Sequence, residues 1–460
     1  MAHVFEEKRI QRALLKLGLP AMLGSLATLI YNLADTYFVS MTNSPAQIAA
    51  VTLSTPVLLI IMSISSIGGM GGSSVIARML GEKNTQDAKS CVSFCFYAMA
   101  GAGVVALLLG LLFVSPIAKL AGADAENTGY TCDYLKWIFL GAPFIILSNG
   151  LVHIFRSTGL IREATIAVVL GNGINIVLDW LFIVRLRMGT AGAAAATSIG
   201  FLCATIYEII CMMRSSADGF RFSLSPKSLH VTGALAGDVV KIGIPGALIT
   251  IMLSVSNMVL NNYIGIYGSD AVACYGIAYK LDMFPILLSV GFSQGIAPLI
   301  GYCYGAKDRE RLGKVMRFGM LDDFILGAAF TALFLAFAGP LASIFLHEET
   351  LIKQSARFLR IMGQSAAMLG IINMVTSYYQ ALGKAMNSLL ITMMRNVILF
   401  IPCVILLNAV FGLNGTISAQ PVVETLLAVL CAAMYLKSSA QKASAQAGQE
   451  KTAKAGNPAA

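Results

Sequence analysis

Long hydrophobic runs alternate with short polar links along almost the whole chain. Runs such as 98–114 and 389–410 carry almost no charge, and each approaches the roughly 20 apolar residues that a helix needs to cross a bilayer. The links between them are rich in Gly, Asn and Lys or Arg. The pattern therefore predicts an all-α polytopic membrane protein with no room for a separate soluble domain.

Twelve spanning helices are predicted, each bounded to within about four residues. They cover residues 16–40, 48–78, 90–114, 132–155, 164–184, 190–212, 240–264, 271–302, 318–338, 357–379, 386–410 and 414–436. Because twelve is even, both termini fall on one side of the membrane. The first run contains Asn32 and Asp35 and is too long for a cleaved signal peptide, so we expect it to remain as span one.

Composition and charge agree with this topology. Hydrophobic residues make up 57% of the chain and charged residues 12%, which suits lipid better than water. A net charge of +9 in a soluble protein would suggest nucleic-acid binding, but most of the 32 Lys and Arg residues fall on the side of the termini. The positive-inside rule then places both termini in the cytoplasm, in a multi-pass protein of the inner (cytoplasmic) cell membrane.

The second half of the chain repeats the first. Residues 16–20 (KLGLP) recur as 241–245 (KIGIP), and Gly81 recurs as Gly305. Each half holds six spans, an even number, so both repeats enter the membrane in the same orientation. We therefore predict two parallel six-helix lobes, 1–228 and 229–436, with substrate between them. The tail 437–460, rich in Ala, Ser, Gln and Lys, is predicted to be disordered.

Two carboxylates of the first half have no counterpart in the second, since Asp35 aligns with Leu260 and Asp179 with Cys403. A charge at mid-span costs about 2.5–3.5 kcal/mol on insertion scales. Such a cost requires a reason, and a functional site is the reason we favour.

Polar neighbours strengthen this interpretation. Tyr31 lies one helical turn from Asp35, and Asn175 lies one turn from Asp179, while Thr197 is expected at a similar depth in the outer half of the membrane. Two carboxylates in a low-dielectric site cannot both stay ionised cheaply, so the pair should bind a proton or a monovalent cation. The alternative is that each Asp only caps or pairs locally.

Other intramembrane polar groups mark a candidate substrate cleft. Lys280 either lines this cleft or competes with the transported cation for the first-lobe acids. The alternative is that it pairs with a neighbour or reaches the outer surface. Glu424 lies at a depth similar to that of Arg395, and we favour a structural ion pair over a substrate-binding acid there. The candidate cleft residues are Lys280, Asn257, Asn261 and Glu424. No nucleophile–base pair or metal-ligand cluster is recognisable, so we expect neither an enzyme nor a cofactor.

Several motifs, in this order and spacing, make the sequence similar to the multidrug and toxic compound extrusion (MATE) family. They are Pro20, 31–36 (YNLADT), 68–69 (GG), 77–81 (ARMLG), 156–159 (RSTG), 175–179 (NIVLD), 295–298 (GIAP) and 304–307 (YGAK). The resemblance covers essentially the whole chain apart from the tail. It implies a V-shaped pair of six-helix bundles that expels mainly cationic, amphipathic compounds in exchange for protons or sodium ions.

Within the family, the branch of DNA-damage-inducible exporters carries its ion site in the first lobe. The resemblance places that site on Tyr31, Asp35, Asn175, Asp179 and Thr197, with Asn149 as an addition. Other branches also use acids in spans seven and ten. Here span seven offers only amides such as Asn257 and Asn261, and span ten offers Asn373 and Gln364, so we expect the ionisable groups to belong chiefly to the first lobe.

The leading hypothesis is thus a secondary active antiporter, expected to be monomeric, that exports small organic cations by alternating access with H⁺ or Na⁺ as the coupling ion. A flippase for a lipid-linked saccharide is the alternative, because such proteins can share this architecture. It would more naturally present a basic cavity for pyrophosphate. A membrane-bound enzyme is a third and weaker alternative.

Overall fold

The computed structural model describes residues 5–42, 44–123, 127–214, 216–217, 220–221, 233–346 and 348–455. The first lobe is built of long helices joined by short turns. They are α2 (Ile10–Ser40), α3 (Pro45–Gly81), α4 (Thr85–Leu112), α5 (Val114–Leu120), α6 (Thr128–Ser157), α7 (Ile161–Asp179), the π-helix η1 (Trp180–Arg185) and α8 (Gly189–Arg214). Two short strands follow, β1 (Ser216–Ala217) and β2 (Phe220–Arg221), paired antiparallel with Ser216 opposite Arg221.

The second lobe repeats this arrangement. Its elements are α9 (Gly233–Gly265), α10 (Ser269–Gly305), α11 (Arg309–Ser343), α12 (Glu349–Met362), the 3₁₀ turn η3 (Gly363–Ser365), α13 (Ala366–Ala381), α14 (Ala385–Met393), the π-helix η4 (Met394–Ile398) and α15 (Phe400–Ala455). The predicted lobe boundary between residues 228 and 229 lies outside the described residues.

Every predicted span coincides with helix. Within the described residues, ten helical segments are long and apolar enough to cross a membrane. The longest of them, Ala385–Lys437, breaks at Gly412, where φ is +60°, and so contains two predicted spans. The helix α9 matches the seventh predicted span. Large side chains such as Leu108 and Leu406 are 62% and 66% exposed, an arrangement that lipid stabilises and water does not.

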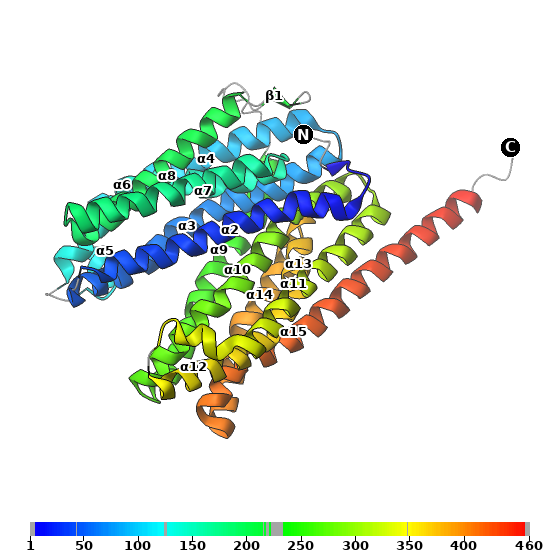
Figure 1. Ribbon diagram of the computed structural model, residues 1–460. Helices are drawn as coiled ribbons and strands as arrows, with labels where there is room; N and C mark the ends of the chain where they lie inside the picture. The colour runs from blue at the N-terminus through cyan, green and yellow to red at the C-terminus, as the bar shows by residue number, and fades with distance from the viewer. Residues whose placement is uncertain are drawn as a thin grey trace.

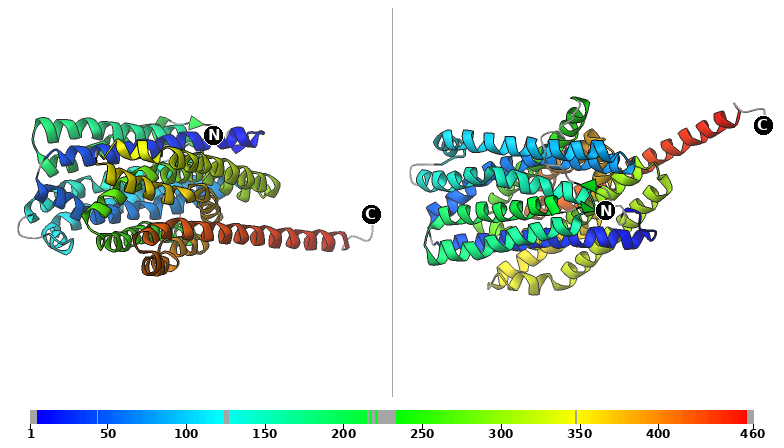
Figure 2. Two further views of the ribbon diagram at one scale, coloured as in Figure 1. Left: turned by 60° about the horizontal axis from the view of Figure 1, so that its bottom comes forward. Right: turned by 90° about the horizontal axis from the view of Figure 1, so that it is seen from above.

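The segment after residue 436 is helical, because α15 continues to Ala455. Figure 1 and Figure 2 show this part of α15 projecting away from the bundle. Ala, Gln, Lys and Glu all have high helix propensity, whereas an isolated helix without tertiary packing is marginal in water. The disorder that composition predicts for 437–460 therefore stays a prediction.

The repeat extends to unusual backbone conformations. Positive φ angles occur at corresponding positions of the two halves, at Lys83 and Lys307, Gly159 and Gly383, and Gly189 and Gly412. A non-helical residue also breaks corresponding helices, at Phe113 before α5 and at Phe337 within α11. The corresponding spans five and eleven each contain a π-helix, but at different heights. The duplicated halves therefore share turns and breaks as well as sequence.

Two glycine contacts hold the lobes together. A Cβ on Gly71 of α3 would overlap the backbone of Val239 on α9, and one on Gly243 would overlap the backbone of Ile67. The corresponding contact pairs Gly295 of α10 with Gly18 of α2. Because Gly71 corresponds to Gly295 and Gly18 to Gly243, the two contacts are related by the pseudo-two-fold axis of the repeat.

The lobes meet at the membrane side that carries the termini. Gly81 and Gly305, at the ends of α3 and α10, pack against the backbones of Tyr302 and Arg78. Figure 1 shows the two sets of helices converging towards the N terminus and diverging towards α5 and α12. The structure is therefore a V that opens on the side away from the termini.

Candidate functional site

The first-lobe residues predicted for ion coupling, apart from Asn149, come together between α2, α7 and α8. Asp179 ends α7, directly before the π-helix η1, and is fully buried. The partly buried Asp35 of α2 lies close enough for the two carboxyl groups to influence each other's charge. The Asn175 amide donates a hydrogen bond of 3.1 Å to the Thr197 hydroxyl, and Tyr31 lies beside both Thr197 and Asp35. The predicted cluster thus exists as a geometric unit.

Several buried oxygens in this cluster find no hydrogen-bond donor among the described residues. Both carboxylate oxygens of Asp179 and the side-chain oxygen of Asn175 are buried and lack a hydrogen-bond partner among the described residues. Buried polar oxygens are normally satisfied, so these three positions fit a proton or a hard monovalent cation, both of which carboxylate and amide oxygens bind. Groups of three or more His, Cys, Asp or Glu suited to a multivalent metal were not found within the described residues.

Asn149 and Tyr134 differ from the sequence expectation. The hydrogen bond that Asn149 makes goes to the carbonyl of Ile145 in its own helix, 2.9 Å away, which is a local contact. Tyr134 of α6 lies near Tyr31, Asp35 and Asp179 and is buried. Sequence reasoning missed Tyr134, which lies between the charged residues Asp133 and Lys136 near the start of span four, because only the packing of α6 brings it to the two acids.

The second lobe contains buried acids of its own, contrary to the expectation that ionisable groups belong chiefly to the first. Asp282 is 1% exposed and accepts a hydrogen bond of 3.0 Å from Gln420. Asp323, also 1% exposed, accepts one of 2.9 Å from Ser289, which in turn accepts one from Asn373. These acids lie in spans eight and nine rather than seven and ten, and Asp323 was missed by sequence reasoning.

The ion pair favoured from the sequence is present. Arg395, in the π-helix η4, places its guanidinium 2.6 Å from the Glu424 carboxylate. The other Glu424 oxygen accepts a hydrogen bond of 2.6 Å from Ser365. One Glu424 oxygen is thus paired with a cation and the other with a hydroxyl group, so this carboxylate is not free to bind another group.

A cavity of about 430 Å³ lies against this ion pair, and both Arg395 and Glu424 line it. Most of its lining comes from the second lobe, including Asn257, Tyr275, Tyr279, Gln420 and Glu424, while Ser66, Met70 and His153 come from the first. Of the four predicted cleft residues, Asn257 and Glu424 line the cavity. Lys280 and Asn261 are exposed and are not part of this lining.

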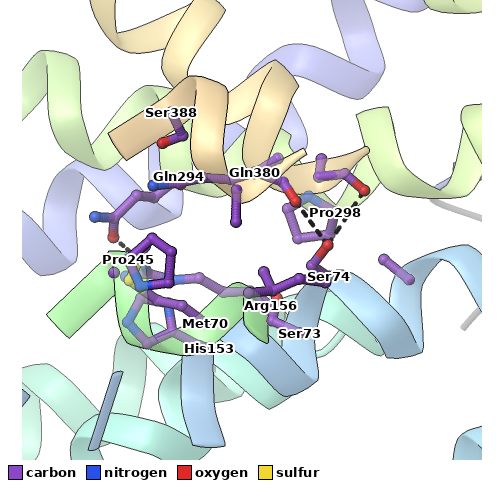
Figure 3. Close-up of a pocket in the computed structure, with 16 residues that line it drawn as sticks. Met70, Ser73, Ser74, His153, Arg156, Pro245, Gln294, Pro298, Gln380 and Ser388 are labelled. Atoms are coloured by element: carbon purple, nitrogen blue, oxygen red, sulfur yellow. Dashed lines mark hydrogen bonds between the residues drawn. The ribbon is translucent and has the colours of Figure 1, made fainter. Parts of the chain in front are cut away.

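A smaller pocket of about 40 Å³ adjoins the cavity where the lobes meet. Figure 3 shows Arg156 of the first lobe lying across it beside Gln294 and Gln380 of the second. The Arg156 guanidinium donates a hydrogen bond of 3.0 Å to Gln294, and the Ser74 hydroxyl donates one of 2.7 Å to the carbonyl of Gln380. These polar contacts join the lobes on the closed side of the V.

Comparisons with known proteins agree in both sequence and fold. The profile of the MatE family matches residues 20–181 and 245–405, one segment in each lobe. The multidrug export protein MepA of Staphylococcus saprophyticus is 30% identical over 427 residues, which cover 93% of this chain and 94% of that protein. MepA of Staphylococcus aureus is 30% identical over 431 residues, covering 93% and 94%.

Solved structures are similar over nearly the full length. An outward-facing multidrug resistance MATE family transporter of the MOP superfamily superposes with a TM-score of 0.90 at 23% identity, covering 96% of this chain and 98% of that one. A MATE structure in complex with MaL6 gives 0.90 at 24% identity, covering 96% and 99%. The predicted all-α fold of twelve spans in two lobes is thereby confirmed. The chain therefore belongs to the MatE family of multidrug and toxic compound extrusion proteins, which are ion-coupled multi-pass membrane transporters and not enzymes.

Proposed function

We propose that this protein exports amphipathic, mainly cationic organic compounds in exchange for protons or sodium ions. The observation that carries the proposal is the fully buried carboxyl group of Asp179, which lies against that of Asp35 and receives no hydrogen bond from a donor group among the described residues. Both acids belong to the lobe opposite to the one that forms most of the 430 Å³ cavity. Relatives named as multidrug export proteins support the same function.

The cavity suits a drug-sized amphipathic molecule. Its volume falls within the range of small-molecule sites, and aromatic and Met side chains dominate such adaptable surfaces. Tyr275, Tyr279 and Met283 supply an apolar wall, and Asn257 and Gln420 supply hydrogen-bonding groups. Arg395 is paired with Glu424 and is therefore not free to bind a pyrophosphate.

Ion and drug are coupled through the two states of the transporter. In the outward-open V, Asp35 and Asp179 take up a proton or Na⁺, and this weakens drug binding in the cavity, so that the drug leaves to the outside. The return of the transporter to its inward-facing state then delivers the ion to the inside and exposes the empty drug site. Coupling requires that each ligand bind the two states with different affinity. We place the open side of the V outside and both termini in the cytoplasm, as the distribution of Lys and Arg supports.

The finer assignments are part of the same proposal. The positions of Tyr31, Asp35, Asn175, Asp179 and Thr197 support an ion site of the kind found in the DNA-damage-inducible exporter branch. We also propose that the protein works as a monomer, because each lobe and the cavity between them belong to one chain.

The test is dye efflux in proteoliposomes, with a pH gradient and a Na⁺ gradient imposed separately. Asp35→Asn and Asp179→Asn should abolish gradient-driven efflux while dye binding in detergent persists. Asp133→Asn is the matched control, because that acid is 57% exposed and paired only with Lys136. Gradient-driven efflux that survives in both mutants would refute the coupling site, and its absence from the wild type would refute the export function.

A further inference from the structure

Arg156 is a buried cation without a counter-ion among the described residues. It lies near the end of α6, is 6% exposed and lines the 40 Å³ pocket between the lobes. Its hydrogen-bond partner is the neutral amide of Gln294, and its Nε has no partner in the part of the chain that the structure describes. Arg156 takes part in none of the ion pairs found among the described residues. Buried charges are ordinarily paired, so this guanidinium lacks an anion.

The internal repeat indicates that packing does not require the charge. The position corresponding to Arg156 in the second lobe is Gln380, 224 residues later. Gln380 lines the same pocket from the other side of the pseudo-two-fold axis, as Figure 3 shows. A shorter, neutral side chain therefore occupies the equivalent place, and at this pair of positions only the first lobe carries a positive charge.

The pocket has the size of a small anion and opens towards the drug-sized cavity. Its volume of about 40 Å³ accommodates a chloride ion or a carboxylate group but not a drug. Met70, His153, Gly246, Gln294 and Gln380 line both the pocket and the cavity. A ligand whose body occupies the cavity can therefore extend a small group to Arg156.

We propose that Arg156 and Gln294 form an anion subsite at the closed end of the cavity. The guanidinium supplies charge-assisted hydrogen bonds, and the Gln294 amide supplies a further donor. The subsite takes a carboxylate-sized anion, either the carboxylate of a zwitterionic transported compound or free chloride. If the anion is the carboxylate of a transported compound, the inference rests on the proposed export function. If the anion is free chloride, the inference is independent of that function.

The experiment compares a rhodamine that has a free carboxylate with its methyl ester, which is a cation. Affinities of the purified protein for both dyes are measured by fluorescence polarisation in chloride and in gluconate buffer, and melting temperatures are recorded in both. The variants are Arg156→Gln, which copies the residue of the second lobe, Arg156→Lys, and Arg156→Gln/Gln380→Arg, which moves the charge across the axis.

If the anion is the carboxylate of the substrate, Arg156→Gln weakens binding of the free-carboxylate dye about tenfold and that of the ester less than about twofold. Arg156→Lys retains part of the affinity, and the charge-swapped double variant recovers it. If the anion is free chloride, gluconate lowers the melting temperature of the wild type but not that of Arg156→Gln. Either result supports the subsite.

The proposal is overturned if Arg156→Gln folds with an unchanged melting temperature, binds both dyes with wild-type affinity, and responds to chloride as the wild type does. Absence of ester efflux in the wild type would contradict the export function instead. The chloride dependence of the melting temperature would still decide the subsite, so the two failures are distinguishable.

Discussion

The guanidinium of Arg395 lies 2.6 Å from the carboxylate of Glu424, and this ion pair ties two spans together across the break at Gly412. Glu424 is 3% exposed and also accepts a hydrogen bond from Ser365. Removing one member of a buried pair leaves the other charge uncompensated, whereas removing both does not. The pair therefore stabilises the packing of spans eleven and twelve at the wall of the cavity.

Replacing Arg395 should consequently destabilise the protein more than replacing both partners. Arg395→Gln is expected to cost about 3 kcal/mol, because the Glu424 charge loses its partner, and to lower the melting temperature in detergent. The double variant Arg395→Gln/Glu424→Gln should recover part of the loss. If the loss of stability in the double variant equals the sum of the losses in Arg395→Gln and Glu424→Gln, the two side chains do not stabilise each other.

Thr197 is predicted to position the ion site through Asn175. Thr197→Val keeps the shape of the side chain but removes the acceptor of the 3.1 Å hydrogen bond from Asn175. We expect the apparent affinity for the coupling ion to fall about tenfold, the equivalent of one well-placed hydrogen bond. Thr197→Ser retains the hydroxyl and should stay near wild type. Efflux measured against a graded ion gradient tests both variants.

The lobe contact at Gly243 should control which state the protein adopts. A Cβ there would overlap the backbone of Ile67, so Gly243→Ala should separate the lobes on the closed side and lower the melting temperature. Gly237 lies on the same helix with nothing within 4 Å of an added Cβ, and Gly237→Ala should be neutral or stabilising by up to about 1 kcal/mol. Spin-label distances between α3 and α9 report the separation, and equal distances in both variants would argue against the contact.

Asn257 should contribute to drug binding where Asn261, one turn away, does not. Asn257 lines the cavity, whereas Asn261 is exposed and lies outside its lining. Asn257→Leu is expected to weaken dye binding about fivefold, as the loss of one neutral hydrogen bond would, and Asn261→Leu to leave it unchanged. Equal effects of the two substitutions on the dissociation constant would show that the cavity is not the drug site.

Sequence alone accounted for the architecture and for most residues that the fold brings together in the first-lobe cluster. Spanning helices can be recognised in a sequence because crossing the lipid requires about 20 consecutive apolar residues. The repeat can be recognised because Gly and Pro recur at constant spacing in the two halves. The cluster of Asp35, Asp179, Asn175 and Thr197 was accessible because each carboxylate is conspicuous in an apolar run and has a polar neighbour one helical turn away.

Contacts between distant spans needed the tertiary structure. Asp282, Asp323 and Glu424 are far apart in sequence, and their burial with partners from other helices depends on how the second lobe packs. The same packing excludes Lys280 and Asn261 from the cavity, places Tyr134 beside the two first-lobe acids, and buries Arg156 between the lobes. Periodicity specifies which face of a helix a residue occupies, but only the assembled helices decide what that face meets.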